Sequence, residues 1–210
     1  MIVNRLPTVL TFCLPLVACG AAPAPSPDGP GASKATNSSA PDISGHWVSQ
    51  CVKVSEQQIM KLDFQITKDT WTLDYTTFAD PACQTKFLTV HIEGPYEMGN
   101  PAASIKGAFE GKFGFTKKTV TPHIDAAVGF LGSDKGCGGG SWTVGAASDV
   151  LKKGCAGLGQ RPGITCSADY DLVYTDGNTL TFGARPTDNN MCTADKRPVA
   201  LSKLSMKRVP

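Results

Sequence analysis

Hydrophobic side chains recur at every second position over much of the chain, which is the pattern of strands that bury one face. The alternation is clear over residues 61–67, 71–75 and 87–93, and turn residues separate these segments. Gly94 and Pro95 then interrupt the pattern, and residues of this kind often end a strand. Consecutive strands joined by short turns predict an antiparallel sheet.

The segment 104–116 is predicted to be one strand with two unlike faces. Its odd positions carry bulky apolar residues interleaved with Gly107 and Gly111, whereas its even positions are largely polar. Glycines weaken an ordinary strand. In barrels they occur at bends and where the lumen stays open. The pattern fits both an open cavity and a packed core with bent strands.

One short helix is predicted next. Thr121 fits a helix cap and Pro122 fits the first helical turn. Apolar residues then follow at helical spacing from Ile124 to Leu131, and Gly132 can end the helix.

The remaining strands are expected towards the C-terminal end of the chain. Asp176-Gly177 is a turn dipeptide between strands at 166–175 and 178–184. A short strand is expected at 141–144, and a last strand lies within 198–207.

The first strand is expected to open the fold at Gly45. Trp47 is large enough to plug one end of a barrel, and Gly-x-Trp on a first strand resembles lipocalins, in which it closes the bottom. We therefore expect a mainly β fold, namely a lipocalin-like antiparallel β-barrel or half-barrel with one short helix and three disulfides.

Cysteine usage indicates an exported protein. Of eight cysteines, Cys13 lies in a signal sequence and Cys19 at its cleavage site, which leaves six for the fold. An even number in an exported domain predicts a disulfide framework. From the expected positions of the strands and turns we predict the pairs Cys51–Cys83, Cys137–Cys155 and Cys166–Cys192.

Residues 1–18 are predicted to be a lipoprotein signal peptide. Arg5 precedes a short apolar run, and the run ends in Leu16-Val17-Ala18-Cys19. This ending resembles the lipobox of bacterial lipoproteins, which implies that Cys19 becomes the first mature residue and carries acyl chains such as palmitate. Residues 19–42 are read as the lipidated cysteine and a flexible linker, and residues 43–210 as a single β-barrel domain.

These features predict a location and exclude several function classes. Gly20 after the cysteine favours the outer membrane of the cell envelope, on its periplasmic or surface face. A net charge of +2 gives no electrostatic case for a nucleic-acid partner. Enzyme motifs are incomplete, so we expect no enzyme and no cofactor. His91 with Glu93, and Asp169 with Asp171, share strand faces without a third ligand, so we expect solvated faces and no metal site.

Aromatic residues on several strands are the candidate ligand-binding residues. In a closed barrel, the apolar faces of separate strands converge on the lumen. The candidates are Phe64, Trp71, Tyr75, Phe109, Phe113, Phe115, Tyr170 and Phe182.

Several different short motifs occur in a fixed order along most of the chain. They are Gly45-x-Trp47-Val48-Ser49-x-Cys51, Asp80-Pro81-Ala82-Cys83, Val120-Thr121-Pro122, Cys137-Gly138-Gly139, Trp142, Gly154-Cys155, Arg185-Pro186-Thr187-Asp188 and Lys196-Arg197-Pro198. In this order they resemble the domain of the adenomatosis polyposis coli down-regulated family, from Gly45 to Pro198. The resemblance implies a β-barrel-like fold with an apolar region suited to lipid or acyl groups.

The chain also departs from that family. Its animal members carry the domain in tandem on membrane-anchored proteins that restrain Wnt signalling, whereas this chain has one copy. Cys166 and Cys192 have no counterpart among the shared cysteines, which supports their pairing with each other. Lys53-Val54 and Met60-Lys61-Leu62 replace family motifs. The roles of those motifs, and the Wnt partner, are therefore not carried over.

The favoured hypothesis is a membrane-anchored extracytoplasmic lipoprotein that holds a lipid or acyl chain in its barrel. The alternative is a structural or protein-interaction lipoprotein of the envelope with a packed core and no ligand.

Overall fold

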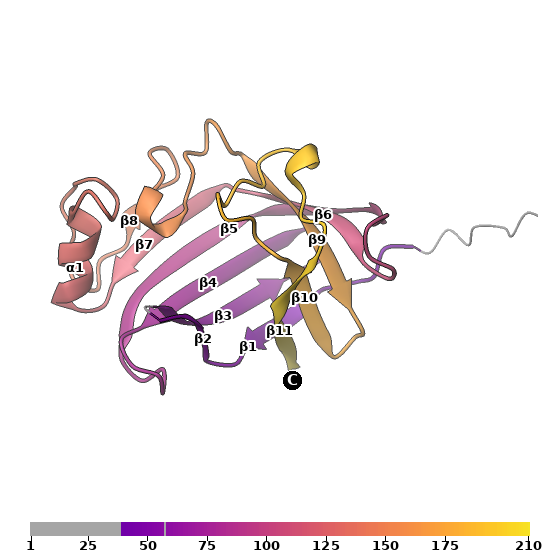
Figure 1. Cartoon of the computed structure of the whole chain (residues 1–210), viewed down its shortest axis with the longest axis horizontal. Helices are drawn as coiled ribbons and strands as arrows, with labels where there is room; N and C mark the ends of the chain where they lie inside the picture. The colour runs from indigo at the N-terminus through magenta and orange to yellow at the C-terminus, as the bar shows by residue number, and fades with distance from the viewer. Residues whose placement is uncertain (1–38, 57) are drawn as a thin grey trace, which may run out of the picture. The chain divides into compact units, whose positions relative to one another are not determined.

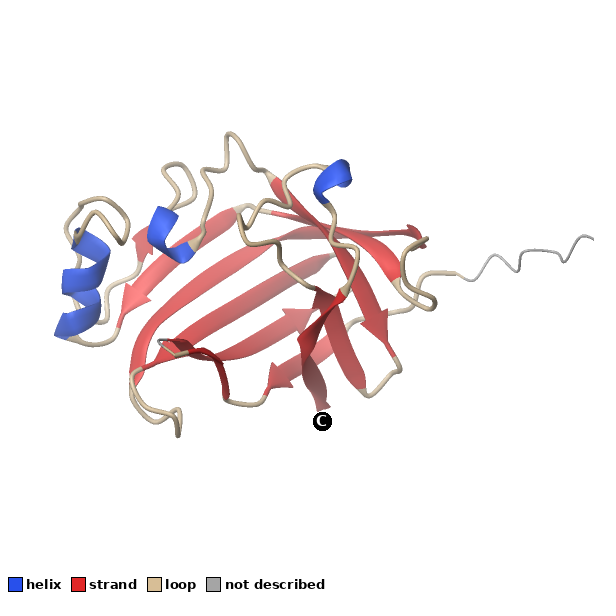
Figure 2. Cartoon of the chain, in the orientation of Figure 1, coloured by secondary structure: helices blue, strands red, loops and turns tan. Residues whose placement is uncertain are grey.

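A computed structural model describes residues 39–56 and 58–210 of the chain. These residues form antiparallel strands with one α-helix and two short 3-10 helices (Figures 1 and 2). The predicted signal peptide and Cys19 lie outside the described residues, as does most of the predicted linker. The elements are β1 (Gly45–Ser49), β2 (Val52–Ser55), β3 (Gln58–Ile66), β4 (Thr70–Phe78), β5 (Lys86–Pro101), β6 (Phe109–Gly114), β7 (Lys117–Pro122), α1 (Asp125–Gly132), β8 (Ser148–Asp149), η1 (Ala156–Leu158), β9 (Ala168–Thr175), β10 (Thr179–Gly183), η2 (Ala194–Lys196) and β11 (Leu201–Val209).

Eight strands close into a barrel, so the expected mainly β fold is confirmed. The hydrogen-bonded order is β3-β1-β11-β10-β9-β6-β5-β4, and β4 pairs with β3 again. Every pairing in this ring is antiparallel. The other three strands extend the sheet beyond the ring, with β2 on β3, β7 on β5 and β8 on β7.

One end of the barrel is sealed around Trp47. Its indole is fully buried and donates from Nε1 to the carbonyl of Ile43 at 2.9 Å. The guanidinium of Arg208 lies 4.3 Å from the centre of the indole ring, as in a cation–π contact, and donates to the carbonyl of Ser44. Gly45 has a φ of +144°, and a Cβ there would lie 2.5 Å from Arg208. The Gly-x-Trp pattern therefore combines a backbone that favours glycine with an aromatic plug.

Strand β5 does not end at Gly94 and Pro95, which corrects the predicted strand end. The strand continues to Pro101, and it pairs with β7 over Leu88–Glu93 and with β6 from Tyr96 onward. At Gly94 the backbone of Gly114 lies so close to the strand that a Cβ on residue 94 would be 1.9 Å from the Gly114 carbonyl oxygen. Glycine is required here by close backbone approach and not by a turn.

The helix begins later than its sequence signals indicate. Thr121 and Pro122 belong to β7, because they pair with Thr89 and Leu88 of β5. The helix α1 starts at Asp125 and ends at Gly132, and the predicted end is therefore confirmed. None of the helices in the described part of the chain has the length and apolarity needed to cross a membrane.

Two other predicted strands are also corrected. The segment 104–116 holds only β6, since residues 104–107 form a bend and turn and the chain turns a corner after Gly114. Residues 141–144 form no strand, because they lie in a loop bounded by Cys137 and Cys155.

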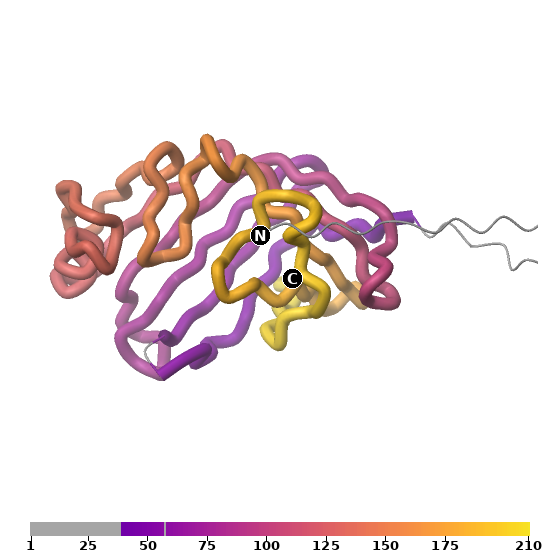
Figure 3. The backbone as a smooth tube through the Cα atoms, turned by 45° about the horizontal axis from the view of Figure 1, so that its top comes forward, coloured from indigo at the N-terminus to yellow at the C-terminus, as the bar shows by residue number. Residues whose placement is uncertain are grey.

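The structure contains the three disulfides that the sequence predicts, Cys51–Cys83, Cys137–Cys155 and Cys166–Cys192. The first joins the end of β1 to the turn after β4. The second joins the loop after α1 to the residue just before η1, and the third joins the loop after η1 to the loop after β10. Figures 1 and 3 show the loop of residues 154–167 (orange) and the loop of residues 184–200 (yellow) side by side beside the barrel.

Replacing Gly94 with alanine should destabilise the fold strongly. The new Cβ would overlap the backbone of Gly114, and overpacking of this kind costs about 1–3 kcal/mol or more. Gly129→Ala is the matched control, because Gly129 lies in α1 with nothing within 4 Å of a new Cβ. Alanine in a helix gains up to ~1 kcal/mol over glycine. Urea unfolding measures both, and equal stability of the two variants would contradict the close approach.

Candidate functional site

The barrel encloses a cavity of about 420 Å³. This volume falls within the range of roughly 300–1,000 Å³ that is typical of small-molecule sites. Every strand of the ring except β1 contributes to its wall, together with η1, the two residues after it and the loop that follows β10. The lining residues are Gln58, Met60, Leu62, Phe64, Trp71, Leu73, Tyr75, Ile92, Phe113, Leu158, Gly159, Gln160, Asp169, Asp171, Phe182, Gly183, Arg185, Asn189, Ser202, Leu204 and Met206.

The wall of the cavity changes from apolar to polar along the barrel axis. On β3 the lining residues run from Phe64, beside Trp47, through Leu62 and Met60 to Gln58. Side chains two residues apart point to the same face of a strand, so this series maps depth within the barrel. We call the end near Trp47 the apolar end and the opposite end the polar end.

Strands β11 and β9 show the same gradient. On β11 the lining residues change from Met206 through Leu204 to Ser202 as the strand is followed away from the sealed end. On β9 the inward residues change from the buried Val173 to Asp171 and Asp169. Three separate strands therefore place apolar groups at one end of the cavity and polar groups at the other.

Aromatic rings build the apolar end. Phe64 stacks on Phe182 with ring centres 4.9 Å apart, and Phe113 meets Phe182 edge-on at 5.3 Å. Trp71 lies 5.4 Å from Phe113, also edge-on, and donates from its indole N–H to the carbonyl of Gly114. These contacts fix the ring positions, because edge-on and offset arrangements are the favourable ones for aromatic pairs.

Five of the eight candidate aromatic residues line the cavity, namely Phe64, Trp71, Tyr75, Phe113 and Phe182. The other three lie elsewhere. Phe109 is buried beside Val173 near the start of β6, and Phe115 lines a small adjoining pocket of about 20 Å³. Tyr170 lies on the face of β9 opposite to Asp169 and Asp171, where Arg197 covers its ring at 5.6 Å.

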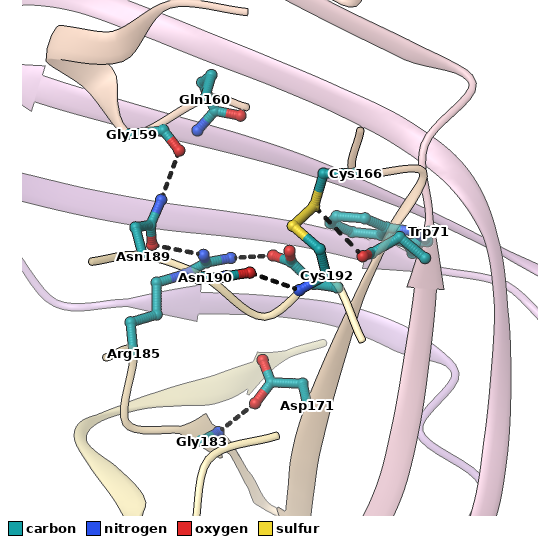
Figure 4. A network of polar contacts seen from close by, with 12 residues as sticks. Trp71, Gly159, Gln160, Cys166, Asp171, Gly183, Arg185, Asn189, Asn190 and Cys192 are labelled. Carbon is teal, nitrogen blue, oxygen red and sulfur yellow. Dashed lines mark hydrogen bonds and ion pairs between the residues drawn. A yellow bond between two sulfur atoms is a disulfide. The ribbon is translucent and has the colours of Figure 1, made fainter. Parts of the chain in front are cut away.

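A cluster of charged side chains forms the polar end. Asp169 and Asp171 point inward from β9, and their residues are only 8% and 7% exposed. Arg185, just after β10, forms an ion pair with Asp169 and donates to the side-chain oxygen of Asn189 at 2.7 Å. Asp171 accepts the backbone N–H groups of Leu172 and Gly183 at 2.7 and 2.9 Å. Figure 4 shows Arg185 reaching towards Asn189, and Asp171 beside Gly183.

The prediction that Asp169 and Asp171 lie on a solvated strand face is therefore wrong. Both faces of β9 are covered, because the segment around Arg197 lies over the outer face and the barrel interior meets the inner face. The alternation of Asp169, Asp171 and Val173 was the available signal for this arrangement. In the sequence, Arg185 belongs only to a family motif; its position two residues beyond β10 brings it to the cavity.

Burial shifts the ionisation of this cluster. It raises the pKa of Asp171 to about 7, against the lowering effect of Arg185 and of the two backbone N–H groups. For Arg185, burial alone lowers the pKa, but the neighbouring Asp169 and Asp171 outweigh it and hold the pKa above its ordinary value. Burial likewise raises the pKa of Tyr75, whose hydroxyl accepts a hydrogen bond from Gln58.

Lys118 is a buried cation near the polar end. Its residue is 3% exposed, and its Nζ lies 3.5 Å from the centre of the Phe115 ring. Burial lowers the pKa of Lys118 to about 8, with Asp169 raising it and Arg185 lowering it further. Lys118 shares the small adjoining pocket with Asp169 and Arg185.

The two loops at the polar end are joined to each other. Asn189 donates from Nδ2 to the carbonyl of Gly159 at 2.6 Å, and Arg161 donates to the carbonyl of Asp188 at 3.0 Å. The disulfide Cys166–Cys192 links the same segments covalently (Figure 4). These three links hold Arg185 and Asn189 in place beside the cavity.

A separate cluster of charged and polar side chains, centred on His91, lies on the outside of the barrel. His91 contacts Asp74 at 2.6 Å and Glu93 at 2.8 Å, and Glu93 also meets Lys117 at 2.7 Å. His91 lies between inward-facing Val90 and Ile92, so it faces outward, as predicted. Within residues 39–56 and 58–210, no group of three or more histidine, cysteine or acidic residues is arranged to hold a metal ion.

The stability of the fold should fall with rising pH because of Asp171. Between its ordinary pKa of 3.8 and about 7 the folded protein holds a proton on Asp171 that the unfolded chain releases. A raised folded-state pKa of an acid therefore lowers the free energy of unfolding as pH rises through this window. Asp171→Asn should remove this part of the pH dependence, whereas Asp134→Asn in an exposed loop should not.

The measurement is urea unfolding of wild type and both variants at a series of pH values across this window. We expect Asp171→Asn to gain stability relative to wild type as pH rises. Parallel stability curves for wild type and Asp171→Asn would show that Asp171 ionises in the folded protein as it does in the unfolded chain.

Comparison with known proteins places the barrel in a family. No curated protein matches the chain at a significant level. A family model described as Adenomatosis polyposis coli down-regulated 1 matches residues 30–150. The match covers the strands from β1 to β8, and with them Trp47 of the sealed end, Phe64, Trp71 and Phe113 of the apolar end, and Lys118. The chain therefore belongs to the adenomatosis polyposis coli down-regulated 1 family.

Proposed function

We propose that this protein is a membrane-anchored, extracytoplasmic binding protein whose barrel holds a hydrophobic ligand such as a lipid or acyl chain. The observation that carries the proposal is the cavity of about 420 Å³ with an aromatic apolar end. Family membership and the closed barrel are compatible with this function.

The shape of the cavity favours a single elongated apolar chain. It has one sealed end, and its apolar lining continues from Phe64 and Trp71 up to Met60 and Leu204. An apolar chain would enter from the polar end and displace water from this wall. Each buried CH2 group contributes about 0.8 kcal/mol, so a long chain needs no charged anchor to bind.

The proposal includes attachment to a membrane through Cys19. The signal sequence and the cysteine at its cleavage site support this part, and the Ala-, Pro- and Ser-rich residues 19–42 would serve as a spacer. The location that follows is the outer membrane of a cell envelope, with the barrel on the periplasmic or surface face.

The alternative hypothesis, a packed barrel that acts only through protein contacts, requires the interior to be filled. The cavity favours ligand binding over that alternative, since natural interiors contain few voids larger than a water molecule.

Lipid extracted from the purified protein should show the ligand directly. We expect native mass spectrometry to detect a bound lipid that is released on organic extraction. The delipidated protein should bind single-chain lipids, with affinity rising up to about fourfold for each added CH2 until the cavity is full. A protein that neither retains nor rebinds any lipid would support the packed-core alternative.

Filling the cavity should abolish this binding. Leu204→Trp places a large ring in the cavity, whereas Lys203→Trp puts the same ring on the exposed, opposite face of β11. We expect Leu204→Trp to weaken lipid binding at least tenfold and Lys203→Trp to leave it unchanged, with circular dichroism confirming the fold of both. Equal binding by the two variants would place the ligand outside the barrel.

Membrane attachment is tested in the full chain by Cys19→Ala. We expect wild type to take up radiolabelled palmitate and to sediment with the membrane fraction when it is expressed in a bacterial host. Cys19→Ala should lose the label and the membrane association. Cys13→Ala is the matched control and should retain both. Unlabelled wild type would contradict lipidation.

A further inference from the structure

The charged side chains at the polar end of the cavity already have partners within the protein. Asp169, Asp171 and Arg185 line this end, and Lys118 and Arg161 line the small adjoining pocket. Asp169 is paired with Arg185, and Asp171 is held by backbone N–H groups. Lys118 lies over an aromatic ring, and Arg161 donates to a backbone carbonyl. A ligand ion would therefore meet charged groups that are already engaged.

Burial makes an extra charge at this position costly. Asp169, Asp171 and Lys118 are each less than 9% exposed. A charged ligand group beside them would lose its water without gaining a free counter-ion. Moving an ion out of water without such a partner is strongly unfavourable.

Uncharged polar groups surround the same end of the cavity. Gln58 donates to the hydroxyl of Tyr75, which leaves the Tyr75 O–H free to donate to another acceptor. Ser202 and Gln160 also line the wall. Hydroxyl and amide groups of this kind can both donate and accept hydrogen bonds.

From this arrangement we propose that the polar end is a head-group site that selects single-chain lipids with an uncharged, hydroxyl- or ester-bearing head over fatty carboxylates and long-chain amines. This inference rests on the proposed function, because it assigns the head of the ligand whose apolar chain occupies the barrel. The chain would lie among Phe64, Trp71 and Phe182, and the head would lie near Gln58, Tyr75 and Ser202.

The ionisation of the cluster supports the same selection. The surroundings raise the pKa of Asp171 to about 7 and lower the pKa of Lys118 to about 8, and in both cases burial is the largest cause. The site thus disfavours negative charge on an acid and positive charge on a base. A ligand carboxylate or ammonium group would meet the same penalty.

The test compares three ligands with the same alkyl chain, namely a monoacylglycerol, a fatty acid and an alkylamine. Binding to the delipidated protein is measured by displacement of a fluorescent lipid at about pH 7.5, where the free acid and free amine are charged in water. We expect the monoacylglycerol to bind at least tenfold more tightly than either charged ligand. A fatty acid or amine that binds as tightly as the monoacylglycerol would overturn the inference.

Charge variants provide the second arm of the experiment. Asp171→Asn removes a negative charge but keeps an oxygen that can accept hydrogen bonds from the N–H groups of Leu172 and Gly183. The affinity for the fatty acid, relative to that for the monoacylglycerol, should therefore rise at least fivefold. Lys118→Met removes a positive charge and should shift preference towards the amine. Asp134→Asn, in an exposed loop, should leave the order of the three ligands unchanged.

The outcomes separate this inference from the proposed function. If no ligand binds to the wild type, the proposed function itself fails. If all three bind and neither Asp171→Asn nor Lys118→Met changes their order, the barrel binds lipid but the polar end does not select the head. Gln58→Leu is a variant without any charge change. It should weaken binding of the monoacylglycerol more than binding of the amine.

Discussion

The antiparallel pairing of β1 with β11 closes the barrel. It joins the first and last strands of the fold, with His46 opposite Val209 and Ser49 opposite Met206. Without it the sheet would be an open, curled layer with two edges. Closure gives every strand of the ring an inner face and so creates the cavity. It also brings Arg208 over Trp47, and this contact seals one end.

The cavity combines an apolar wall with a charged cluster that would be unusual in a simple core. Taking a charged group out of water costs free energy that its partners within the protein only partly recover. Asp169, Asp171 and Lys118 are each less than 9% exposed, so folding alone explains these charged groups poorly. Beside them, Arg185 and Asn189 lie on a loop that a disulfide and two hydrogen bonds join to the loop after η1. This rigid support is what a selective site requires.

Much of the fold could be predicted from local patterns. The period-two alternation found most strands of the barrel, Asp176-Gly177 marked a real hairpin turn, and the three cysteine pairs were assigned correctly. The predictions were wrong where residues that usually end or begin an element are present because of contacts with distant parts of the chain. Gly94 and Pro95 resemble a strand end, yet the glycine is needed because the backbone of Gly114 crosses there. Thr121 and Pro122 resemble a helix start, yet they pair with β5 and therefore belong to β7.

Local patterns in the sequence are enough to establish strands with two unlike faces, a disulfide framework and aromatic residues on the faces of several strands. Which face of each strand points inward depends on how the barrel closes. On β9 the hydrophobic pattern predicts that Tyr170 faces the barrel interior, but Asp169 and Asp171 face it instead. Both faces of this strand are covered, so alternation shows which residues share a face but not which face points inward. Arg185 joined the site for a related reason, since its position depends on where the loop after β10 is tied and not on any local pattern.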